Sequence, residues 1–197
     1  MPRLSAYMAE AASKPLPEAV AERGKQAILD TLAAMISGSE LPPGKMALKF
    51  AAAYRGDNSA TVAASNVLCG PVEAALANGM LAHSDETDDT HPASLSHPGA
   101  AVVPAALASG EKFGGSGERF MRAVALGYDI GPRMTMTLGK IEYMAATHRS
   151  THALSGVFGA ASAAGLMARL SAQQMRWLLR SEEHTSELQS LRHLVCR

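Results

Sequence analysis

Proline and glycine divide this chain into segments of helical length, and this spacing limits the fold more than any other feature of the sequence. Apolar positions between Pro17 and Gly38 recur at helical spacing, and Gly70-Pro71 and His97-Pro98 each precede another such segment. Proline suits the first turn of a helix, where its missing N–H has no partner to lose, and glycine suits the residue at the helix end. Residues 57–70 alone favour a short extended pair. The chain is therefore predicted to be an all-α helical bundle domain.

The apolar content fits helices that pack closely together. Hydrophobic residues make up 47% of the chain and aromatic residues only 5%, so alanine and methionine carry much of the apolar content. Alanine has the highest helix propensity, and small side chains let helix axes approach one another. Within 43–55, Met46, Phe50 and Ala53 share one helical face and are expected to point into the core. Ser171-Ala-Gln-Gln174 resembles a capping box that starts a further helix.

The distribution of charged and apolar residues excludes several classes of partner. The chain has 18 basic and 18 acidic residues, without a lysine- or arginine-rich block that would follow a phosphate backbone, so nucleic acid is not an expected partner. No apolar stretch reaches the roughly 18 residues that would span a bilayer, so no membrane association is expected. Cys69 and Cys196 have no motif spacing, which favours a reducing, cytoplasmic location.

The strongest local signal is the polar stretch 83–98, which connects two expected helices. It contains three histidines and four carboxylates, together with several hydroxyl groups. Loops between rigid helices often carry catalytic groups. His97 is expected at a helix N-terminus, where the helix dipole favours a neutral imidazole and attracts an anion such as a substrate carboxylate. Acids beside partly buried imidazoles supply the shifted pKa values that proton transfer needs.

The residues alone leave three alternatives to this catalytic interpretation. The stretch can be a solvated acidic loop that caps two helices. The His/Asp cluster at 83–97 can be the site of a metal-dependent hydrolase, although neither the H-E-x-x-H spacing of zinc sites nor the glycine of a calcium loop is present. The chain can also be a non-catalytic helical interaction module. We predict no metal and no organic cofactor.

Two segments resemble the signatures of the MmgE/PrpD family, which includes 2-methylcitrate dehydratase, cis-aconitate decarboxylase and iminodisuccinate epimerase. The first is ANGMLAHSDETDDTHPASLSHPGAAVVPAALA, at 77–108, and the second is RSTHALSGVFGAASAAG, at 149–165. In the first segment, Asn78-Gly79, His83, Asp88-Asp89-Thr90 and His97-Pro98 match the usual family pattern. The resemblance extends over residues 4–179.

The resemblance implies a cofactor-independent lyase or isomerase that acts next to a carboxylate of a small di- or tricarboxylate, in the manner of 2-methylcitrate dehydratase. The exact substrate and the choice among dehydratase, decarboxylase and epimerase stay open. The residues expected to be catalytic are His97, Glu86, Asp88, Thr90 and His152, and those expected to bind substrate are Asp89, His91, Ser150 and His148.

The chain departs from the family pattern at two places. Glu86-Thr87 stands where the family usually has Asp-Phe, so the first acid is one methylene longer. Ser150 occupies the place of the catalytic histidine of the second segment, and His148 and His152 flank it. Either imidazole can fill that role, and His152 is the one we expect to do so.

The resemblance also predicts how the chain is organised. Residues 1–179 are expected to form a partial MmgE/PrpD helical domain, truncated before the α/β lid domain and a later lysine of the family. Residues 180–197 resemble an in-frame translation of a sequencing adapter, and we interpret them as a non-native tail. We therefore expect this fragment to be inactive, and the full-length protein to be a homodimer.

Overall fold

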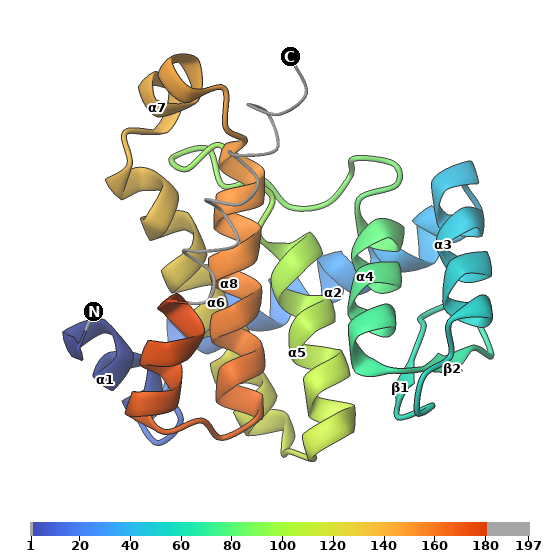
Figure 1. Ribbon diagram of the computed structural model, residues 1–197, viewed down its shortest axis with the longest axis horizontal. Helices are drawn as coiled ribbons and strands as arrows, with labels where there is room; N and C mark the ends of the chain where they lie inside the picture. The colour runs from blue at the N-terminus through green and yellow to red at the C-terminus, as the bar shows by residue number, and fades with distance from the viewer. Residues whose placement is uncertain (1, 181–197) are drawn as a thin grey trace.

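The computed structural model describes residues 2–180, and most of them are helical (Figure 1). A small antiparallel pair joins β1 (Ala60–Thr61) to β2 (Leu68–Cys69). The helices are α1 (Pro2–Glu10), α2 (Glu18–Gly38), α3 (Pro42–Ala53), α4 (Pro71–Ala82), α5 (Gly99–Phe113), α6 (Gly117–Thr137), α7 (Lys140–Thr147) and α8 (Thr151–Met167), followed by a helical segment at 172–180. The predicted all-α class and the extended pair within 57–70 are confirmed. The predicted tail at 180–197 lies, apart from its first residue, outside the described residues.

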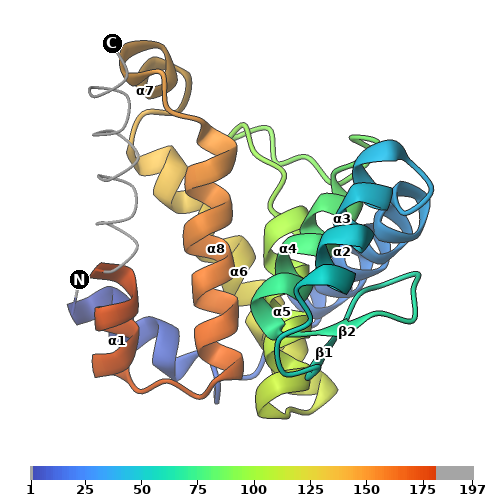
Figure 2. The same cartoon turned by 45° about the vertical axis from the view of Figure 1, so that its right-hand side comes forward.

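The helices form two packed layers around α5. In the first layer α3, α4, α5 and α8 lie side by side, each in contact with the next (Figure 2). In the second layer α2 runs behind α4 and α5 and reaches α6, while α6 packs most extensively against α8. Within residues 2–180, no helix combines the length and apolar character needed to cross a bilayer.

Glycines allow α6 and α8 to cross closely. A Cβ atom on Gly131 of α6 would collide with the carbonyl oxygen of Ser155 and lie 3.2 Å from the Cα of Gly159, both on α8. Backbones approach to this distance only where a side chain is absent. The crossing fixes the first turn of α8 beside α5, and this turn carries one of the candidate site residues.

The predicted core face of α3 is wrong. Met46 is 60% exposed and Phe50 is 36% exposed, whereas Ala47 and Ala51 are fully buried. The cause is the close packing of α3 against α4, which places small side chains in the contact and turns the large ones outward.

Candidate active site

The loop 83–98 brings two histidines to the ends of two helices. His83 ends α4, with its backbone N–H donated to the carbonyl oxygen of Gly79 at 3.1 Å, and His97 lies two residues before α5 begins at Gly99. The first turn of α8 adds His152 beside them. The ring centroids of His83 and His97 are 5.4 Å apart, and those of His97 and His152 are 4.8 Å apart. These three residues form what we call the imidazole row.

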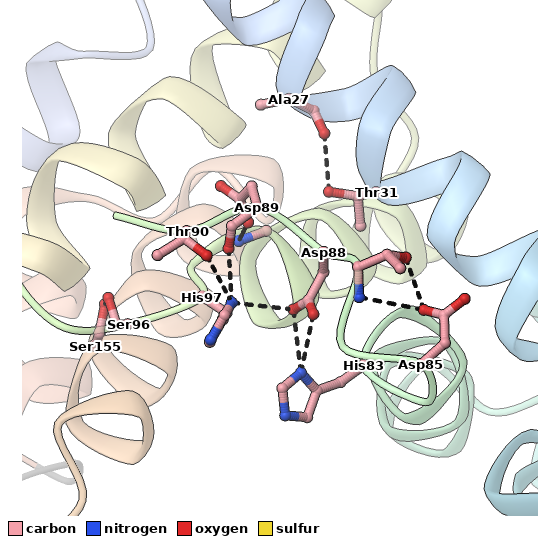
Figure 3. A network of polar contacts seen from close by, with 12 residues as sticks. Ala27, Thr31, His83, Asp85, Asp88, Asp89, Thr90, Ser96, His97 and Ser155 are labelled. Atoms are coloured by element: carbon pink, nitrogen blue, oxygen red, sulfur yellow. Dashed lines mark hydrogen bonds and ion pairs between the residues drawn. The ribbon is translucent and has the colours of Figure 1, made fainter. Parts of the chain in front are cut away.

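Asp88 is the carboxylate that faces this row. Its side chain is fully buried, and its two oxygens lie 3.0 and 3.2 Å from Nδ1 of His83 (Figure 3). One of the same oxygens is 3.9 Å from Nδ1 of His97. An ionised carboxylate can only accept hydrogen bonds, so His83 donates from Nδ1. A buried charge held in this way orients both rings.

The hydrogen bonds of His97 leave one nitrogen of its ring for chemistry. Nδ1 lies 2.9 Å from the backbone carbonyl of Asp89 and 3.5 Å from the hydroxyl of Thr90. A carbonyl oxygen requires a donor, so Nδ1 carries the hydrogen and Nε2 of the neutral ring carries the free lone pair. The side chain is 21% exposed, which leaves it in reach of a small molecule. This arrangement suits a general base.

The surroundings of His152 lower its pKa although the residue is exposed. Burial lowers its pKa from the ordinary value of 6.5, and the neighbouring His97 and His83 lower it further because a second positive charge beside them is unfavourable. Asp88 acts in the opposite direction and raises the pKa, but its effect is smaller. The direction of this shift favours the neutral, proton-accepting form of His152 next to His97.

Asp89 points to the other side of the loop, away from the row. One of its oxygens accepts the backbone N–H of Gly99 at 2.9 Å, and the hydroxyl oxygens of Thr31 and Tyr128 gather around the same glycine. Burial raises the pKa of Asp89, and burial also raises the pKa of Tyr128. The start of α5, where we expected a substrate anion, thus already holds a carboxylate of the protein.

Three further predicted site residues lie apart from the row. Glu86 is exposed, with a left-handed backbone (φ 55°), and within residues 2–180 no hydrogen bond or ion pair joins it to an imidazole. His148 is exposed and also left-handed, where it ends α7. Ser150 caps α8 by accepting the backbone N–H of Ala153 at 3.3 Å. The structure therefore brings His152 to the row, and gives Ser150 a position at the helix end.

His91 belongs to a chain of serine hydroxyls that the sequence did not reveal. Its Nδ1 lies 2.8 Å from the hydroxyl of Ser94, which is 2.7 Å from that of Ser96. Ser96 in turn donates to Ser155 of α8 at 3.0 Å. The spacing of serines in 94–96 was the one available signal, but their partner is distant in sequence.

A cavity of about 820 Å³ lies on the Asp89 side of the loop, between α2 and α6. Its lining includes Arg23 and Asp30 of α2, Tyr128 of α6, and the loop residues Asp89 and His91. Sequence reasoning identified neither the cavity nor its α2 and α6 residues. Among residues 2–180, no three or more histidine, cysteine, aspartate or glutamate side chains converge as they would to hold a metal ion.

Comparison with known proteins shows which proteins the chain resembles in sequence. The MmgE/PrpD N-terminal domain matches residues 2–189. The chain is 29% identical over 171 residues to the cis-aconitate decarboxylase-like protein oryM of Aspergillus oryzae, covering 83% of this chain and 35% of that protein. It is 31% identical over 169 residues to the cis-aconitate decarboxylase of Homo sapiens, covering 82% and 34%. The cis-aconitate decarboxylase of Aspergillus terreus is 27% identical over 128 residues, covering 62% and 26%.

The chain therefore spans about a third of the length of the curated relatives that match it over most of its length. The match covers both predicted signature segments, and with them His83 and His97 of the first segment and His152 of the second. This chain belongs to the MmgE/PrpD family, and the part of the family that it matches is the N-terminal domain.

Proposed function

We propose that this chain is the N-terminal part of a cofactor-independent lyase or isomerase that acts at a carbon next to a carboxylate of a small di- or tricarboxylate. The observation that carries the proposal is the imidazole row on the buried carboxylate of Asp88. Reactions of this class pass through a carbanion-like state that needs a base, an acid and nearby positive charge. Adjacent imidazoles can accept and donate protons, and an imidazolium supplies the positive charge.

We assign the first proton transfer to Nε2 of His97. In a dehydration, this nitrogen takes the proton from the carbon next to the carboxylate, and the hydroxyl group on the neighbouring carbon leaves as water with a proton from an imidazolium. In an epimerisation, it takes the same proton, and an imidazolium returns a proton to the opposite face of that carbon. In a decarboxylation, the electrons of the broken C–C bond pass to that carbon, which then takes a proton from an imidazolium, and CO₂ leaves. His152 exchanges this proton, while Asp88 orients the row and Thr90 supports Nδ1 of His97.

The other predicted site residues have different proposed roles. Asp89 and Ser150 hold helix starts, and His91 bonds Ser94, so we propose that they shape the site instead of contacting substrate. Glu86 is exposed and makes no hydrogen bond or ion pair to an imidazole among residues 2–180, so we give it no part in the first proton transfer. His148 stays a proposed substrate contact.

Cis-aconitate is the first substrate to test, because it is named for the relatives in Aspergillus and Homo sapiens. A 2-methylcitrate dehydratase activity is the second. We propose that the isolated chain is inactive and that the full-length protein is a cytoplasmic homodimer. An exposed apolar stripe on α4 is consistent with packing against a further domain or subunit. Val72 is 74% exposed, and Leu76 and Met80 follow it at one-turn spacing.

The test compares His97→Ala with Phe113→Ala in the full-length parent protein. Phe113 is exposed at the opposite end of α5 from the row, so its loss leaves turnover of cis-aconitate unchanged. His97→Ala removes the base and lowers kcat by roughly a hundredfold or more. Near-wild-type turnover in His97→Ala would defeat the proposal. Partner binding without any turnover would favour the interaction module, and loss of activity with a chelator would favour the metal-dependent hydrolase.

A further inference from the structure

Buried hydroxyl groups join the turn before His97 to the first turn of α8. Ser96 donates from its hydroxyl to the hydroxyl of Ser155 at 3.0 Å, and Thr151 donates to the carbonyl oxygen of Leu95 at 2.7 Å. Ser96, Thr151 and Ser155 are all buried, with at most 1% of their surface exposed. Water cannot replace these bonds without a rearrangement of the packing.

The two hydrogen bonds involve residues that are next to His97 and His152 in the chain. Ser96 directly precedes His97, and Thr151 directly precedes His152. The two rings lie 4.8 Å apart between their centroids. Because each bond is anchored next to an imidazole, the two bonds together set the distance between the backbone segments that carry the rings.

The turn itself is closed, so that it moves as one piece. The backbone N–H of His91 is donated to the carbonyl of Ser96 at 2.9 Å, and the hydroxyls of Ser94 and Ser96 are 2.7 Å apart. Ser94 is fully buried. A change at the contact with α8 is therefore passed to His97 instead of being absorbed within the turn.

We propose that Ser96, Ser155 and Thr151 are positioning residues that hold His97 and His152 at the spacing needed for proton exchange between them. The effect on chemistry rests on the proposed function, but the spacing itself can be measured without substrate. A displacement of about 1 Å between reacting groups can lower a rate by roughly a hundredfold, so hydroxyls that never touch substrate can still control the reaction.

The test uses the 197-residue chain and follows the imidazole resonances of His152 by NMR as a function of pH. The charged and titratable groups that face this ring are His97, His83 and Asp88. Thr151→Val and Ser155→Ala each remove one of the two bonds. We expect both to raise the pKa of His152 towards its ordinary value, because the ring moves away from His97 and His83, which lower that pKa. Thr151→Ser keeps the hydroxyl and restores the original titration.

Ser162→Ala is the matched control. Ser162 is a buried serine of the same helix, but its hydroxyl bonds only the carbonyl of Phe158 in its own helix, at 2.7 Å, among the described residues. This variant loses a comparable buried bond and leaves the titration of His152 unchanged. If Ser155→Ala does not fold, Thr151→Val decides the question, since valine keeps the shape of threonine.

A second measurement separates this inference from the proposed function. Titration with cis-aconitate should show binding several-fold weaker in Thr151→Val than in Ser162→Ala. If His152 titrates in Thr151→Val and in Ser155→Ala as it does in Ser162→Ala, the positioning role is refuted. If the titration changes but the unmodified chain and its full-length parent bind no cis-aconitate, the positioning role stands and the proposed substrate class fails.

Discussion

Gly99 offers the sharpest test of how the loop is fixed to the helical core. A Cβ atom at this position would lie 2.5 Å from a carboxylate oxygen of Asp89, 2.6 Å from the hydroxyl of Thr31 and 2.7 Å from the hydroxyl of Tyr128. All three distances are shorter than real Cβ atoms tolerate, so Gly99→Ala must displace at least one of these groups. Asp89 has the most to lose, since it accepts the N–H of the same residue.

The size of the effect follows from two contributions. Overpacking a filled site costs about 1–3 kcal/mol. A hydrogen bond to a charged acceptor contributes about 1.5–3 kcal/mol, and the displaced Asp89 loses part of this. We therefore expect Gly99→Ala to lower the free energy of unfolding by about 2–4 kcal/mol, which corresponds to a fall in Tm of about 5–15 °C for a chain of this size.

The assay is urea unfolding followed by circular dichroism, with Gly117→Ala as the control. Gly117 is also the first residue of its helix, but a Cβ atom there meets nothing within 4 Å. Alanine in open space at a helix start costs nothing and can stabilise slightly, because it restricts the unfolded chain. Equal unfolding midpoints for the two variants would refute the crowding described around Gly99.

Two further predictions concern buried and titrating groups. Asn78→Ala should lower the free energy of unfolding by about 2–3 kcal/mol. The side-chain amide of Asn78 accepts the N–H of Ala63 at 2.8 Å and donates to the carbonyl of Thr61 at 2.9 Å, and the variant leaves both partners unsatisfied. An unfolding midpoint equal to that of the unmodified chain would contradict this. Since folding lowers the pKa of His152 below 6.5, its neutral form is favoured in the fold, and the chain loses stability as the pH falls below that value. Between about pH 7.5 and about pH 5, His152→Asn should therefore lose less stability than the unmodified chain does. Urea unfolding at the two pH values measures both losses, and equal losses in the variant and the unmodified chain would rule the effect out.

The helix boundaries could be predicted because they depend on local chemistry. Pro71 opens α4 and the residue after Pro98 opens α5, as the proline positions indicate. The capping box is confirmed by its two reciprocal bonds: the N–H of Ser171 is donated to the side chain of Gln174 at 2.9 Å, and the N–H of Gln174 to the hydroxyl of Ser171 at 3.3 Å. Signals of this kind act within one turn of the chain, so a sequence contains them completely.

The choice of core face could not be predicted, because it depends on which helix lies opposite. Met46 and Ala47 are neighbours on α3, and a hydrophobicity pattern favours the methionine as the core residue. The close contact with α4 reverses the order, and buries the alanine instead. In a chain rich in alanine, the buried face is decided by how closely two backbones approach, and that distance is a property of the pair.

The same limit applies to the site. The loop composition pointed to His83, Asp88 and His97, which lie within one connection. The approach of His152 could be expected only from the family resemblance, because nothing local joins α8 to the loop. Glu86 stays a prediction: residue type and spacing made it a candidate acid, and in the structure it is exposed and has a left-handed backbone.

Asp88 and Asp89 show how the two parts of the site depend on each other. These adjacent carboxylates point to opposite sides of the loop, one towards the imidazole row and the other towards the start of α5 (Figure 3). Neighbouring residues of a chain cannot be placed independently, so the helix that holds Asp89 through the N–H of Gly99 also fixes Asp88. The acid that orients His83 is thereby tied to the helical core through its neighbour, and the Asp-Asp pair works as one structural unit with two different sets of donors.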